Sequence, residues 1–86
     1  MKRTVLVSGS SRGIGRAIAE KIFLDGHNIS LGLRDIKSVK GSILDPEISG
    51  SERILLQKYE ARNSKDAESW VRNSIKKFKS FDTLIN

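Results

Sequence analysis

The chain has 86 residues, of which 37% are hydrophobic, and 16 Lys and Arg against 10 Asp and Glu give a formal net charge of +6. This length allows at most one small domain. The absence of cysteine excludes disulfides and thiolate metal sites and is consistent with a reducing cytosol. The apolar run near the N-terminus is too short for a signal peptide, and no stretch could span a membrane. We therefore expect a soluble cytoplasmic protein.

Residues 4–24 form the most informative stretch of the sequence. Thr4-Val5-Leu6-Val7 is an apolar, β-branched run that is typical of a strand buried on both faces of a parallel sheet. Three glycines follow it, Gly9, Gly13 and Gly15, and then a helical pattern begins. Strand, glycine turn and helix together are the context that a phosphate-binding loop requires, because free N–H groups and the helix dipole attract an anion.

The helix after this loop is expected to bury one apolar face. Its spacing places four residues on that face: Ile14, Ala17, Ile18 and Ile22. Asp25-Gly26 should end the helix, and residues 28–33 predict a second strand. The two strands should be parallel, since strand, helix and strand are complete in about thirty residues, the size of a βαβ unit.

The spacing Gly9-x-x-x-Gly13-x-Gly15 is neither the phosphate loop of the ATPases nor the commoner G-x-G-x-x-G fingerprint. It resembles the T-G-x-x-x-G-x-G motif of the short-chain dehydrogenase/reductase family, with Ser8 at the usual Thr position. The run over residues 7–19 is most similar to carbonyl-reducing members such as 3-oxoacyl-[acyl carrier protein] reductases. The resemblance implies contacts with a nicotinamide dinucleotide from six loop residues: Gly9, Ser11, Arg12, Gly13, Ile14 and Gly15.

The end of the second strand bears on the choice of cofactor. In dinucleotide folds an acid here binds the ribose 2′-hydroxyl, whereas an Arg accommodates the 2′-phosphate of NADP. By the resemblance, the acid of NAD users falls at Leu33 and the basic residue of NADP users at Arg34, while Arg12 matches a second 2′-phosphate position. We therefore predict NADP(H) rather than NAD(H). Asp35 would be the ribose ligand if the register slipped, and both arginines could be plain surface residues.

Residues 35–51 predict only short helices. Asp35 could cap one over residues 36–39, and Asp45-Pro46-Glu47 reads as the start of another. Residues 53–59 predict a third strand at a sheet edge. A helix capped by Asn63 or Ser64 should follow, with Trp70 in the core rather than serving as a stacking platform.

Two further segments resemble the same family. Glu60-Ala61-Arg62-Asn63 looks like its D-V-T-D segment, in which an Asp and the next backbone N–H hold the adenine. This implies cofactor contacts from Glu60 and Ala61, with a solvated turn as the alternative for the Glu60 side chain. Residues 82–86 match the strand D-x-L-V-N-N-A-G through its first Asn, which implies a contact from Asn86.

The predicted fold is α/β: a Rossmann-type, doubly wound parallel sheet with the order β-α-β-α-β-α-β and strands arranged 3-2-1-4. The resemblance covers residues 1–86 and corresponds to the N-terminal part of one NAD(P)-binding domain. The catalytic Tyr, Lys and Ser of the family lie beyond the fourth strand, so no catalytic residue is assigned and Tyr59 is not the family's Tyr. The isolated chain is expected to be inactive.

The resemblance implies an NADP-dependent oxidoreductase that moves hydride between nicotinamide and a carbonyl/alcohol pair. This chain would supply the adenine–ribose–pyrophosphate half of the site to a parent enzyme that acts on a small molecule and forms a homo-oligomer. No membrane or nucleic-acid partner is expected. Two alternatives remain: a non-catalytic NADP-binding or sensing module and, more weakly, a basic nucleic-acid-binding protein, since positive charge attracts both kinds of ligand.

Overall fold

The computed structural model describes residues 2–10, 12–50 and 52–85. Within them the elements follow the predicted alternation, and the short helix expected over residues 36–39 is a 3₁₀ turn, η1. In chain order they are β1 (Thr4–Ser8), α1 (Gly13–Leu24), β2 (Asn28–Leu33), η1 (Ile36–Val39), α2 (Pro46–Ser49), β3 (Ile54–Lys58), α3 (Ser64–Phe78) and β4 (Thr83–Ile85).

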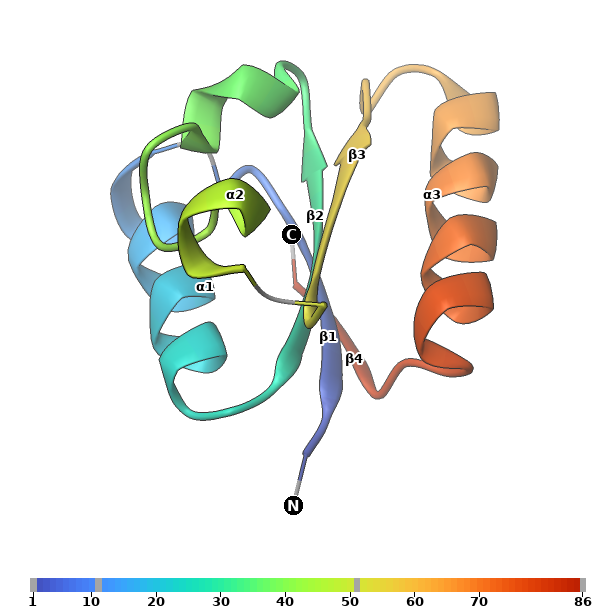
Figure 1. The fold of residues 1–86 in the computed structure, drawn as a ribbon. Coiled ribbons are helices and arrows are strands. Elements are labelled where there is room, and N and C mark those ends of the chain that lie inside the picture. The colour runs from blue at the N-terminus through green and yellow to red at the C-terminus, as the bar shows by residue number, and fades with distance from the viewer. Residues whose placement is uncertain (1, 11, 51, 86) are drawn as a thin grey trace.

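The four strands form one parallel sheet in the order β3-β2-β1-β4, which confirms the predicted topology. Figure 1 shows α1 and α2 on one face of the sheet and α3 on the other. The central strands are therefore covered on both faces, and Leu6, Val7, Ile29 and Leu31 are fully buried. The edge strand β4 is more open, with Leu84 48% exposed.

The buried face of α1 differs from the prediction. Three of the four residues expected in the core are exposed: Ile14, Ala17 and Ile18. The side chains that α1 buries are Ala19 and Phe23, while Ile22 is partly buried against the core. The helix is therefore rotated relative to the face that the apolar spacing indicates.

A close backbone approach at Gly15 explains this rotation. A Cβ on Gly15 would lie less than 3.0 Å from the carbonyl oxygen of Gly9, nearer than real Cβ atoms come to another heavy atom. Only glycine permits the approach, so Gly15, Ala19 and Phe23, each four residues apart, face the loop and the sheet. Apolar spacing could not reveal this, because the helix carries apolar residues on two sides.

Trp70 of α3 lies in the core, as predicted, and is 3% exposed. Its indole Nε1–H donates to the Ser30 hydroxyl at 2.8 Å. The Ser30 and Ser74 hydroxyls are 2.7 Å apart, and the Ser74 hydroxyl donates to the Trp70 carbonyl at 2.7 Å. This buried chain of hydrogen bonds joins α3 to β2 and satisfies the polar atoms that the packing encloses. Ile75, on the same helix, is 42% exposed.

The short helices between β2 and β3 begin where the sequence predicts. The Asp35 carboxylate accepts from the Lys37 N–H at 2.9 Å and caps η1. The Asp45 carboxylate accepts from the backbone N–H groups of Gly41 and Glu47, each at 2.9 Å, and caps α2. These hydrogen bonds lower the pKa of Asp45, and the one from Gly41 has the larger effect.

Asp82 fixes the last strand against the first. Its carboxylate accepts from the Thr4 N–H at 2.8 Å, and its own N–H donates to the Thr4 carbonyl at 2.8 Å. β4 then continues in parallel register with β1, with Thr83 opposite Val5 and Ile85 opposite Val7. Among the residues described, no helix is long and apolar enough to cross a bilayer.

Candidate functional site

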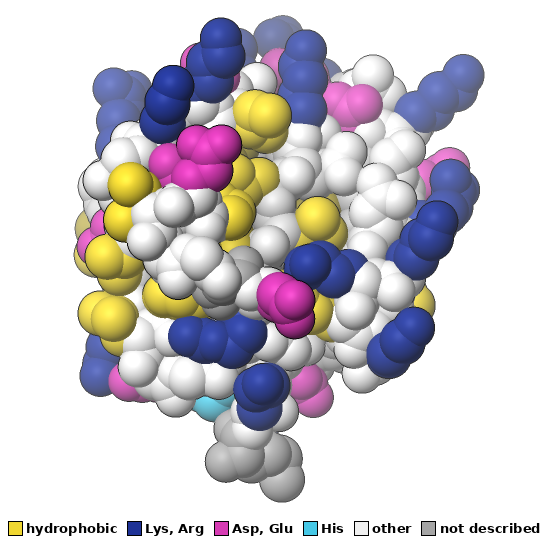
Figure 2. Space-filling view, in the orientation of Figure 1, with side chains coloured by type: hydrophobic (Ala, Val, Ile, Leu, Met, Phe, Trp, Pro, Cys, Tyr) yellow, Lys and Arg dark blue, Asp and Glu magenta, His cyan; other side chains and the backbone are white. Residues whose placement is uncertain are grey.

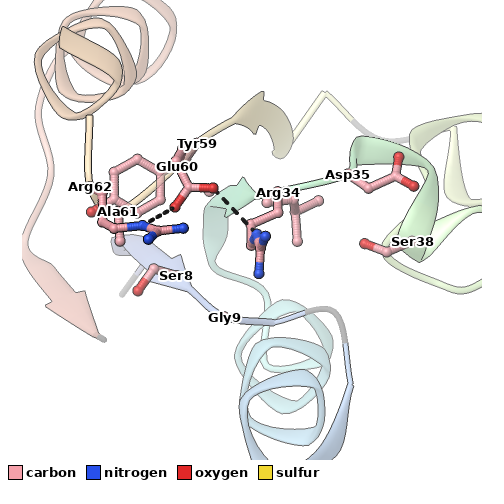
Figure 3. Close-up of a pocket in the computed structure, with 11 residues that line it drawn as sticks. Ser8, Gly9, Arg34, Asp35, Ser38, Tyr59, Glu60, Ala61 and Arg62 are labelled. Atoms are coloured by element: carbon pink, nitrogen blue, oxygen red, sulfur yellow. Dashed lines mark ion pairs between the residues drawn. The ribbon is translucent and has the colours of Figure 1, made fainter. Parts of the chain in front are cut away.

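A cleft of about 540 Å³ opens where β1, β2 and β3 end. In open parallel sheets, ligands bind at these carboxyl ends. The residues that line the cleft come from the ends of the three strands and the segments that follow them: Ser8, Gly9, Gly32, Leu33, Arg34, Asp35, Ser38, Tyr59, Glu60, Ala61 and Arg62. Figure 3 shows how these side chains face the cleft.

The glycine loop leads from β1 beside this cleft to the start of α1. Gly9 and Gly13 have φ angles of 69° and 68°, in the left-handed region that glycine adopts without steric penalty. Arg12 is the N-cap of α1, yet its side chain makes no capping hydrogen bond, and the first turn contains no acidic residue. The N–H groups and the dipole at this helix end are therefore arranged to receive an anion.

The walls of the cleft combine apolar and polar groups. They include the backbone of Gly9, the apolar Leu33 and charged side chains, and the Tyr59 ring packs against Trp70 with ring centroids 4.8 Å apart. The buried hydroxyl of Ser38, at one wall, has no hydrogen-bond partner in the described part of the chain. An oxygen of a bound ribose or phosphate could accept from it, so the site fits such a ligand.

The basic residue predicted at the end of β2 lies in the cleft. The Arg34 side chain is 80% exposed and forms an ion pair with Glu60, with Nε 3.4 Å from Oε2. Leu33, at the position of the acid of NAD users, is 2% exposed and packs in the core. Asp35 also lines the cleft, and its carboxylate is held by the Lys37 N–H.

The segment after β3 forms the opposite wall. The Glu60 N–H donates to the Asp66 carboxylate at 2.9 Å, which fixes the backbone at this point. The Glu60 carboxylate faces two cations, Arg34 and Arg62, the second with Nε 3.8 Å from Oε1. The cleft therefore has one carboxylate between two guanidiniums.

The structure brings together four of the residues that the sequence singles out: Gly9, Arg34, Glu60 and Ala61. The other described loop residues, 12–15, lie at the start of α1 and do not line the cleft. Ser11 and Asn86 lie outside the described residues. The site-residue assignments thus remain predictions, with four of them now placed at one cleft.

Sequence reasoning missed several residues of the cleft. Ser8 and Gly32 lie at the carboxyl ends of β1 and β2, and Tyr59 follows β3, so the rule that ligands bind at these ends could have found them. Ser38 comes from η1, and no motif marks it. Arg62 comes from the turn after β3, where the resemblance implies contacts from Glu60 and Ala61 but none from Arg62.

The sheet order, the glycine loop and the cleft define an α/β protein of Rossmann type. The chain belongs to the short chain dehydrogenase family, whose sequence profile matches residues 3–86.

Individual relatives agree with this. The chain is 38% identical over 82 residues to an agropine synthesis reductase of Rhizobium rhizogenes, covering 95% of this chain and 18% of the relative. It is 28% identical over 87 residues to the 3-oxoacyl-[acyl-carrier-protein] reductase FabG of Staphylococcus epidermidis, covering 100% of this chain and 35% of the relative. The chain thus spans about a third or less of the curated relatives it matches.

Two solved structures share the fold. The L-sorbose reductase of Gluconobacter frateurii, complexed with NADPH and L-sorbose, is 27% identical with a TM-score of 0.83, covering 99% of this chain and 32% of that one. The 3-ketoacyl-(acyl-carrier-protein) reductase of Brucella melitensis, complexed with NADH, is 19% identical with a TM-score of 0.79. It covers 95% of this chain and 32% of that one. The complexes of these two proteins contain different nicotinamide cofactors, NADPH in the first and NADH in the second.

Proposed function

We propose that this chain binds the adenine, ribose and pyrophosphate of NADP(H) for a cytoplasmic oxidoreductase that acts on a carbonyl or alcohol. The observation that carries the proposal is the end of β2, where Arg34 extends into the cleft and a buried Leu33 replaces the acid that would select NAD. When bound, the cofactor supplies a hydride donor or acceptor at its nicotinamide. The described residues would hold its other end.

Each part of the cleft has a role in this proposal. The loop from Gly9 and the first turn of α1 would receive the pyrophosphate. Arg34 would donate hydrogen bonds to the 2′-phosphate, since a guanidinium matches phosphate oxygens bidentately. The wall at Glu60 and Ala61 would contact the adenine. The family resemblance places the catalytic groups elsewhere in a longer enzyme, so the reaction itself belongs to the proposed parent.

On the face that Figure 2 shows, the distribution of charge gives no support to nucleic-acid binding as a second function. Figure 2 shows Lys and Arg side chains spread around the visible face rather than gathered in one patch. A nucleic-acid site would need basic side chains clustered on one face or along one helix.

The test is a calorimetric titration of the chain with NADP⁺ and with NAD⁺. We expect NADP⁺ to bind more tightly, and Arg34→Ala to weaken NADP⁺ by about 10- to 100-fold, the value of a hydrogen bond to a charged group. NAD⁺ binding should change much less. Arg72→Ala removes an exposed arginine from α3, outside the cleft, and is the matched control. Equal losses for both cofactors in Arg34→Ala would refute the role of Arg34.

A further inference from the structure

Glu60 lies between two arginines across the cleft. Its Oε2 is 3.4 Å from the Arg34 Nε, and its Oε1 is 3.8 Å from the Arg62 Nε. The Arg34 and Arg62 side chains are 80% and 89% exposed, and that of Glu60 is 37% exposed. Figure 3 shows Glu60 between the two guanidiniums, with Asp35 and Ser38 on the far side of Arg34. Arg62 lies in the segment that resembles the family's D-V-T-D motif, but the resemblance implies no role for its side chain.

A carboxylate in this position disfavours the binding of a phosphate at Arg34. A phosphate monoester carries a charge of about −1.5 to −2 at pH 7, and it would compete with Glu60 for the donors of the same guanidinium. It would also be repelled by the carboxylate. Glu60 therefore disfavours a 2′-phosphorylated ligand unless another cation offsets its charge.

Arg62 can supply that cation. The two ion pairs use different oxygens of Glu60, so Arg34 can leave Oε2 while Arg62 stays at Oε1. The three side chains carry a net charge of +1 with Arg62 and would be neutral without it. The pairing of Arg62 with Glu60 thus leaves Arg34 available to a ligand and keeps the net charge of these three side chains positive.

We propose that Arg62 is a specificity-determining residue, which favours the 2′-phosphorylated dinucleotide by holding Glu60, the internal competitor for Arg34. The inference rests on the proposed function, because it concerns the ligand of the same cleft. In this role Arg62 strengthens the binding of the phosphate through Glu60 and does not contact the phosphate itself.

A double-mutant cycle on the chain tests this role. The variants are Glu60→Gln, Arg62→Ala and the two combined, titrated with NADP⁺ and NAD⁺ by calorimetry, with folding checked by circular dichroism. Glu60→Gln should tighten NADP⁺ about two- to fivefold and Arg62→Ala should weaken it by a similar factor, the range expected for exposed ion pairs. NAD⁺ should change by less than these factors. Once Glu60 is Gln, adding Arg62→Ala should have no further effect on NADP⁺.

The matched controls are Glu68→Gln and Arg72→Ala, two exposed positions on α3 that make the same changes of charge outside the cleft. They should leave the ratio of the two affinities unchanged. Two results would overturn the inference: no effect of Arg62→Ala on NADP⁺, or an equal loss with and without Glu60, which would mean that Arg62 contacts the phosphate itself. Failure of the unaltered chain to bind either cofactor would instead refute the proposed function, and the inference with it.

Discussion

The contact between Gly15 and Gly9 predicts a sharp effect of one added methyl group. Alanine at position 15 should favour the helix by up to about 1 kcal/mol from propensity alone. Its Cβ, however, would lie less than 3.0 Å from the Gly9 carbonyl oxygen, where ordinary contacts are 3.4–4 Å, and backbone has no flexible end to yield. Such overpacking costs about 1–3 kcal/mol. With the cost at the upper end, the net loss is about 2 kcal/mol.

Urea denaturation followed by circular dichroism measures this loss. A slope of about 1 kcal/mol/M, typical of a small protein, converts it to a midpoint lowered by about 2 M. Ile14→Ala, at a position 80% exposed on the same helix, should change stability by less than about 0.5 kcal/mol. A Gly15→Ala variant as stable as the unaltered chain would show that helix packing at the loop does not depend on this glycine.

Three other outcomes are expected. Ser30→Ala should lower the free energy of unfolding by about 1–3 kcal/mol in urea, because the buried indole N–H of Trp70 loses its acceptor; unchanged stability would contradict this. Folding lowers the pKa of Asp45, so the Asp45 carboxylate stabilises the fold fully above its ordinary pKa of about 3.9, and this stabilisation is lost as the pH falls through the lowered pKa. The melting temperature in acid should therefore depend on pH less steeply in Asp45→Asn than in the unaltered chain. The isolated chain should oxidise no NADPH with carbonyl substrates, since its one tyrosine, Tyr59, is followed four positions later by Asn63 rather than by the Lys of the family's Tyr-x-x-x-Lys; turnover above background would refute this.

The sequence predicted the sheet because its signals are local. A β-branched run, a glycine turn and caps such as Asp45 and Asn63 act within a few residues, and the structure confirms the elements that they predict. The parallel direction of the first two strands followed from the length of the connection between them. These features do not depend on which side chains meet across the fold.

Side-chain placement was harder to predict, because it depends on contacts between distant residues. The rotation of α1 is set by one backbone contact at Gly15, which apolar periodicity does not encode. The hydrogen bond from Trp70 to Ser30 joins residues 40 apart in the sequence. Arg34 and Glu60 lie on different strand ends, and only the fold brings Arg34 to the carboxylate that the nearby Arg62 also contacts.

The central claim is that this cleft binds the adenosine end of NADP through its 2′-phosphate. The most direct measurement compares 2′-phospho-ADP-ribose with ADP-ribose in calorimetric titrations of the chain, since neither ligand carries nicotinamide. We predict that the 2′-phosphorylated ligand binds at least about tenfold more tightly and about as tightly as NADP⁺, as expected if one charge-assisted contact at Arg34 distinguishes them. Equal affinities for the two ligands, or no binding of either, would contradict the claim.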